Sequence, residues 1–154
     1  MLEISPTKHR VAYVQYTSSA RVEFSYIDDA VTLANAISNV EYWTGATYTG
    51  NALQYAYNEV ISIDQREGVR QIILLINDGT SSDEVSQIGT NLRNAGIQLY
   101  ALGYKDAVHE ELMKITNDED RIFIGENAVD LLTFRPKLTE EMCNVYSRSL
   151  VLDQ

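Results

Sequence analysis

The sequence has only one cysteine, Cys143, so it can form no internal disulfide and cannot be a small domain stapled by disulfides. With 2 prolines and 8 glycines in 154 residues, it is neither collagen-like nor of low complexity. Its longest purely apolar run, residues 72–76, is far shorter than the roughly 20 residues that a membrane-spanning helix needs. These absences predict a globular chain without membrane insertion.

Basic residues are also scarce. The chain has 12 lysines and arginines against 22 aspartates and glutamates, which gives a formal net charge of −10. Binding to nucleic acid or to an anionic membrane surface needs a basic patch, so this balance argues against both partners. A hydrophobic fraction of 45% is enough for one core, and we expect residues 1–154 to form a single domain.

The N-terminal part of the sequence predicts two neighbouring strands. Val11–Tyr16 is a run of β-branched and aromatic residues, which is typical of a strand. Residues 21–26 (RVEFSY) alternate strictly between polar and apolar side chains. One solvated face is typical of a sheet edge, and the four residues between the runs suit a hairpin. We therefore expect residues 21–26 to be an antiparallel edge strand.

The rest of the chain alternates between strand and helix patterns. Two nearly continuous apolar runs, residues 71–76 and 97–103, are typical of strands with both faces covered in a parallel sheet. We also expect a short strand at 121–124 and helices at 28–39, after Gly50, after a capping box formed by Ser81 and Glu84, at 107–116, from Ala128 to a break near Pro136, and from Glu140. The alternation predicts an α/β fold with helices on both faces of the sheet.

Polar residues follow the predicted strands at the carboxyl ends, where open α/β sheets form their binding sites. Asp78 and a following glycine end the strand of residues 71–76. The loop before the second helix carries the hydroxyl groups of Thr44, Thr47, Tyr48 and Thr49. Carboxylate and hydroxyl oxygens are ligands that Mg²⁺ or Ca²⁺ prefers. Asp-Gly is also a common turn sequence, so the residues by themselves leave a metal site and a plain turn both open.

Sequence signals for an enzyme are weak. The chain contains no Gly-x-Gly-x-x-Gly, no Walker A motif and no Gly-x-Ser-x-Gly. His9 and His109 have no nucleophile beside them in sequence, and Cys143 has no histidine nearby. We therefore expect a non-enzymatic protein.

Three stretches, in order along the chain, carry a resemblance to a known family. Residues 4–17 (ISPTKHRVAYVQYT) resemble the end of its first helix and its second strand. Residues 44–53 (TGATYTGNAL) resemble its Gly-Gly-Thr-x-Thr-Gly-x-Ala-Leu loop, and residues 72–79 (IILLINDG) resemble its hydrophobic strand ending in Thr-Asp-Gly. The family is the von Willebrand factor type A domain. The resemblance covers residues 4–142 and implies a three-layer, Rossmann-like fold whose mostly parallel sheet has one antiparallel edge strand.

The resemblance also implies site residues. The family binds a divalent cation through an Asp-x-Ser-x-Ser motif after its first strand, a loop threonine and a later aspartate. Thr47 matches that threonine and Asp78 matches that aspartate, whereas the Asp-x-Ser-x-Ser motif is missing. The resemblance implies Mg²⁺ or Mn²⁺ in the complete domain, and we expect this chain to bind neither. The implied ligand-binding rim comprises Thr44, Tyr48, Thr49, Thr80 and Asp83.

The first strand of the family, which lies at the centre of its sheet, is absent from this sequence. We therefore expect an N-terminally truncated, partial domain with an open gap between Val11–Tyr16 and residues 71–76. The unpaired backbone groups at such a gap are costly, so we expect the chain to be aggregation-prone or unfolded in solution.

The resemblance implies an extracellular or secreted module of the cell-adhesion kind. Such a module would bind a protein or extracellular-matrix ligand, in a cation-dependent way in the complete parent domain. The alternative is a truncated α/β nucleotide-binding or hydrolase domain, because loss of a first strand would also remove a P-loop. The ordered pair of Thr47 and Asp78 favours the adhesion module.

Overall fold

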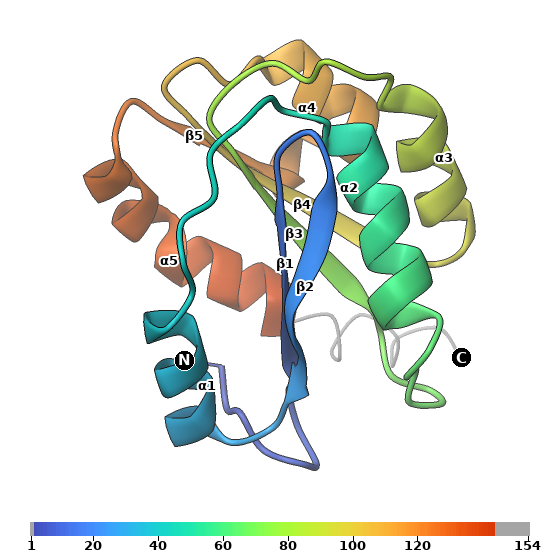
Figure 1. The fold of residues 1–154 in the computed structure, drawn as a ribbon, viewed down its shortest axis with the longest axis vertical. Coiled ribbons are helices and arrows are strands. Elements are labelled where there is room, and N and C mark those ends of the chain that lie inside the picture. The colour runs from blue at the N-terminus through green and yellow to red at the C-terminus, as the bar shows by residue number, and fades with distance from the viewer. Residues whose placement is uncertain (1, 144–154) are drawn as a thin grey trace, which may run out of the picture.

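The structure, a computed structural model, describes residues 2–143. Figure 1 shows three layers, with strands running between two groups of helices. The elements in chain order are β1 (Val11–Tyr16), β2 (Ala20–Ile27), α1 (Ala30–Ser38), α2 (Thr49–Ala56), the π-helix η1 (Tyr57–Ile61), β3 (Ile72–Asn77), α3 (Ser86–Asn94), β4 (Gln98–Tyr104), α4 (His109–Thr116), the 3-10 helix η2 (Glu119–Arg121), β5 (Ile122–Gly125) and α5 (Ala128–Cys143). The predicted three-layer α/β class is confirmed.

The strands form an antiparallel pair and a parallel group. Among the described residues, β2 pairs only with β1, so the predicted antiparallel edge strand is confirmed. The other sheet has the order β3-β4-β5, and all its pairs are parallel. The predicted adjacency of the two apolar strands is also confirmed, with Ile72 opposite Gln98 and Asn77 opposite Gly103.

The strands β1 and β3 do not pair with each other within residues 2–143, so they belong to separate sheets. Side chains of the antiparallel pair reach the β3 segment at both ends instead, from β2 at one end and from β1 at the other. The Tyr26 hydroxyl donates to Gln71 Oε1 (3.2 Å) at the amino end, and the Tyr16 hydroxyl donates to Asn77 Oδ1 (3.4 Å) at the carboxyl end. The predicted open gap is therefore confirmed, and direct closure of the two strands is not observed.

Two apolar clusters hold the layers together. The larger one joins the strands to α2, α3 and α4, and includes Leu53, Leu75, Leu92, Leu99, Leu112 and Ile115. The smaller one consists of Tyr100, Leu102 and Phe123, with Phe134 and Leu138 of α5 packed against it. The prediction that β3 is covered on both faces is wrong at one position, because Ile76 is 51% exposed.

The C-terminal helix differs from its prediction. We expected a break near Pro136 and a new helix from Glu140, but α5 is one helix of 16 residues with Pro136 inside it. A proline inside a helix removes one backbone hydrogen bond and disfavours the helical conformation. The packing of α5 on β5 and β4 outweighs this preference and keeps the segment helical. Any part of the predicted last helix beyond Cys143 lies outside the described residues. No helix in residues 2–143 has the length and apolar character needed to cross a membrane.

Candidate functional site

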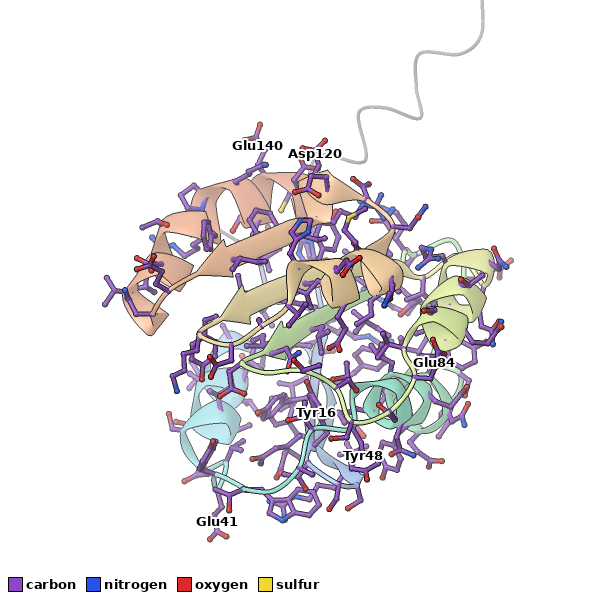
Figure 2. The ribbon with its side chains drawn as sticks, turned by 90° about the horizontal axis from the view of Figure 1, so that it is seen from above. Tyr16, Glu41, Tyr48, Glu84, Asp120 and Glu140 are labelled. Atoms are coloured by element: carbon purple, nitrogen blue, oxygen red, sulfur yellow. The ribbon has the colours of Figure 1, made fainter. Side chains whose placement is uncertain are left out.

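The carboxyl edge of the strands is built from segments far apart in sequence. The loop of residues 44–48 contacts the β1–β2 turn, because the Tyr48 N–H donates to the Thr17 carbonyl oxygen (3.0 Å). It also contacts the loop of residues 78–84, since the Ser82 N–H donates to the Thr47 carbonyl oxygen (2.6 Å). Figure 2 looks down on this edge, where Tyr16 and Tyr48 lie near each other. The edge is thus a joint surface of three loops.

Asp83 caps helix α2 from a different segment of the chain. The residue at the helix's own N-cap position, Tyr48, provides no side-chain cap. The Asp83 carboxylate accepts from the Gly50 N–H at 2.9 Å and from the Asn51 N–H at 2.7 Å. A carboxylate at this position satisfies free helix donors and favours the positive end of the helix dipole. Asp83 therefore holds two loops of the edge together.

Ser81 completes this cap. Its hydroxyl accepts from the Thr49 N–H (3.0 Å) and donates to Asp83 Oδ1 (2.6 Å). The predicted capping box between Ser81 and Glu84 is therefore wrong. The Glu84 carboxylate instead accepts from the N–H groups of Ser86 (2.7 Å) and Gln87 (3.0 Å) at the start of α3, and hydrogen bonds from Gln87 and Ser86 lower the pKa of this carboxyl. Ser81 and Glu84 both cap helices, but not the same one. Ser81 acts at the start of α2 and Glu84 at the start of α3, whereas the capping-box motif assumes one helix for both.

Glu111 lies at this edge too, although the sequence analysis did not predict it as a site residue. It lies in the first turn of α4, and both of its carboxylate oxygens accept from the Ser81 N–H, at 3.1 and 3.0 Å. Its carboxylate ties the loop of residues 78–84 to α4. The available signal was an acidic residue in the first turn of a helix that follows a buried strand, which is too common to indicate a site.

Tyr16 is a second missed residue, and it lies among the acidic groups. Burial is the main cause that raises the pKa of its phenol above the ordinary value of 10.0; the nearby Thr49 hydroxyl acts in the opposite direction. The charges of Asp78, Glu111 and Asp83 each raise this pKa further. The negative charges of three carboxylates, which come from two segments, therefore act on one phenol. The sequence pattern marked Tyr16 only as a strand residue.

This environment predicts a pH dependence of folding. Because the pKa of Tyr16 is raised in the folded state, its contribution to stability is complete below about pH 10 and is lost as the pH rises through the folded pKa. We expect Tyr16→Phe to reduce the loss of stability between pH 9 and pH 11, although it also removes the bond to Asn77. Urea unfolding at a series of pH values measures this. Tyr42→Phe, at an 86% exposed position, should keep the wild-type slope, and equal slopes for Tyr16→Phe and wild type would contradict the prediction.

The structure places the predicted site residues in different environments. Thr47 and Asp78 are half-buried, and Asp78 Oδ2 accepts from the Tyr104 hydroxyl at 3.4 Å. Thr44, Tyr48 and Thr80 are exposed at the rim. Thr49 is fully buried, so its side chain is not part of the exposed rim, and Asp83 is half-buried in the α2 cap.

The oxygen atoms of these residues do not fit a complete cation site. Asp83 and Glu111 already accept backbone N–H groups, and Asp78 accepts a tyrosine hydroxyl. Within residues 2–143, no three or more His, Cys, Asp and Glu side chains are grouped so that they could hold a metal ion. Thr47 and Asp78 would supply only two of the six oxygens of a Mg²⁺ shell. The expectation that this chain binds neither Mg²⁺ nor Mn²⁺ stays a prediction.

Comparison with known sequences gives a consistent group of relatives. The human collagen alpha-5(VI) chain is 34% identical over 149 residues, which cover 93% of this chain and 6% of the collagen. Mouse vitrin is 31% identical over 94% of this chain and 23% of vitrin, and Caenorhabditis elegans cuticlin-6 is 32% identical over 96% and 26%. The chain thus spans a small part of each relative. The relatives are extracellular matrix and secreted proteins, which confirms the predicted extracellular localisation.

Solved structures show the same fold. Proximal thread matrix protein 1 from the mussel byssus, whose MIDAS motif is occupied by zinc, superposes with a TM-score of 0.83 at 22% identity, over 92% of this chain and 36% of that one. The manganese-loaded TRAP protein of Plasmodium vivax superposes with a TM-score of 0.68 at 16% identity, over 89% and 60%. A sequence model of the family described as von Willebrand factor type A domain matches residues 1–136. With the three-layer fold and these relatives, the chain belongs to the von Willebrand factor type A domain family.

Proposed function

We propose that this domain is a non-enzymatic binding module that contacts a protein or extracellular-matrix partner through the carboxyl edge of its strands. One observation carries the proposal: the Ser81–Asp83 cap and the Ser82–Thr47 bond connect the two loops of that edge. A binding surface that is already ordered loses less conformational freedom when a partner binds. We take residues 1–154 as one domain.

The exposed side chains of the edge suit a protein partner. Thr44, Tyr48 and Thr80 present hydroxyl groups and one aromatic ring to solvent. Tyrosine is enriched among the residues that contribute most to protein interfaces. The net charge of −10 favours a partner with a basic surface, because opposite charges accelerate encounter and discourage wrong partners. The nucleotide-binding or hydrolase alternative is not favoured, because the relatives named above are matrix proteins.

Tyr48 is the residue we expect to matter most for binding. The full chain is tested by surface plasmon resonance against immobilised fibrillar collagen, collagen VI and fibronectin. Tyr48→Ala should weaken binding to the recognised protein about thirtyfold, the equivalent of about 2 kcal/mol for an interface hot spot. Tyr13→Ala is the matched control, because Tyr13 is 38% exposed and Tyr48 is 37% exposed, but Tyr13 lies within β1. Equal weakening by both substitutions, or binding to none of the three proteins, would contradict the proposal.

Cation dependence is a separate part of the proposal. We propose that Thr47 and Asp78 face the cation in a complete site of this family, and that this chain by itself holds none. Calorimetric titration of the full chain with Mg²⁺ and Mn²⁺ near neutral pH should give no saturable heat in the sub-millimolar range. A micromolar affinity that is lost in Asp78→Ala, but kept in the exposed control Glu67→Ala, would show that the site is complete without the missing motif.

A further inference from the structure

Residues 40–48 connect α1 to α2 and form neither helix nor strand. One side chain of β1 provides hydrogen-bond partners for this loop. Gln15, which is 7% exposed, donates to the Glu41 carbonyl oxygen (2.9 Å) and accepts from the Trp43 N–H (2.7 Å). A buried side-chain amide is costly unless it is hydrogen-bonded, so these two bonds hold the loop on β1.

The side chain of Trp43 is held by β2 as well. Gln15 Nε2 also donates to Glu23 Oε1 (2.8 Å), and the same carboxylate oxygen accepts from Arg21 Nε. The guanidinium carbon of Arg21 lies 4.8 Å from the centre of the Trp43 ring, within the range of a cation–π contact. The loop and the two strands of the hairpin thus share one network of polar and aromatic contacts.

Tyr42 lies between the two loop residues that Gln15 binds, yet its side chain is 86% exposed. Its neighbours Trp43 and Arg21 are half-buried and exposed, respectively. Tryptophan, tyrosine and arginine are the residue types most enriched among those that dominate the energy of protein interfaces. An exposed ring on a backbone that is already fixed loses little conformational freedom when a partner binds.

We propose that Tyr42, Trp43 and Arg21 form a further part of the partner-binding surface, which we call the aromatic patch. Gln15 is the positioning residue of this patch, because it binds the backbone on both sides of Tyr42. The inference rests on the proposed function, since it extends the surface around Tyr48 along the same loop and onto β2.

The aromatic patch suits a protein segment that presents a lysine or arginine side chain. Such a cation can stack on the exposed ring of Tyr42, and the exposed carboxylate of Glu41 beside it attracts the charge. Figure 2 shows Glu41 pointing away from the molecule. The positive charge of Arg21 is balanced by its ion pair with Glu23, so it does not repel the incoming cation.

Hydrogen exchange of the free, full chain tests the role of Gln15. Methionine has about the volume of glutamine but cannot accept the bond from the Trp43 N–H, so Gln15→Met should accelerate exchange of that amide about tenfold or more. Gln54→Met, on the exposed surface of α2, is the matched control and should leave the Trp43 amide unchanged. Protection of β3 and β4 shows that both variants are folded. Equal exchange of the Trp43 amide in the two variants would overturn the proposal.

Binding to fibrillar collagen, collagen VI and fibronectin, measured by surface plasmon resonance, tests the aromatic patch. Tyr42→Ala should weaken binding to the recognised protein about tenfold, and Gln15→Met about fivefold. In a Tyr42→Ala background, Gln15→Met should have less than about a twofold effect, because the ring that it positions is gone. A merely structural Gln15 would weaken binding by the same factor in both backgrounds, which would overturn its role as a positioning residue.

The charge of the partner is tested with a matched pair of substitutions. Glu41→Gln should weaken binding about threefold, whereas Glu67→Gln, which removes the same charge at an exposed position outside the loop, should not. Equal affinities of these two variants would overturn the assignment of a basic partner. Loss of binding in Tyr48→Ala with full binding in Tyr42→Ala would overturn the aromatic patch and leave the proposed function intact. Binding to none of the three proteins would overturn both.

Discussion

Replacing Gly50 by alanine is expected to destabilise the domain by about 2–3 kcal/mol, because α2 leaves no room for a side chain at this position. A Cβ atom on residue 50 would lie 2.2 Å from the Glu84 carbonyl oxygen and 3.1 Å from Asp83 Oδ2. The first contact is with backbone, so the loop of residues 78–84 must move away from α2. Alanine gains up to about 1 kcal/mol in helix propensity over glycine, which is too little to offset the clash.

A matched control lies in the same loop. Gly79 has nothing within 4 Å of the position that a Cβ would take, so Gly79→Ala should change stability by less than about 0.5 kcal/mol. Urea unfolding followed by circular dichroism measures both variants. If Gly50→Ala were as stable as wild type, α2 and the loop of residues 78–84 would not be in the close contact described here.

Replacing Leu112 by alanine should cost more, about 3–4 kcal/mol of the free energy of unfolding. Leu112 of α4 has no exposed surface and belongs to the larger apolar cluster. Truncation removes buried methyl groups and leaves a cavity in a close-packed core. Since Glu111 is its neighbour in α4, loosening of the helix should also weaken the tie between Glu111 and Ser81.

Leu132→Ala is the control for the same chemical change, because Leu132 of α5 is 67% exposed. Its effect should stay within about 0.5 kcal/mol. Thermal unfolding of the two variants under identical conditions separates burial from residue type. Similar losses for both would mean that the core does not lie between the strands and α4.

The strands were largely predictable from the sequence. The apolar runs placed β1, β3, β4 and β5 to within about one residue at each end, because burial on one or both faces dictates the side-chain pattern directly. The alternating pattern identified β2 as the edge strand for the same reason. Local rules failed at Pro136, where packing of α5 on the sheet outweighs the proline's preference.

The candidate site was only partly predictable. Thr47 and Asp78 were placed through a family resemblance and their position at strand ends. Asp83 as a cap for α2, and Glu111 as a partner of Ser81, depend on contacts between segments about 30 residues apart. No local pattern encodes such contacts, since a short acidic side chain before a helix looks the same whether it caps that helix or another one. The environment of Tyr16 was missed for the same reason.

The role of the carboxyl edge is tested most directly by mapping the partner's footprint on the full chain. Hydrogen exchange is measured with and without the matrix protein that the binding assay identifies. We expect slower exchange in the loops of residues 44–48 and 79–82, with α1 and α5 unchanged. Protection confined to α1 or α5, with both loops exchanging as in the free protein, would contradict the assignment of this edge as the binding surface.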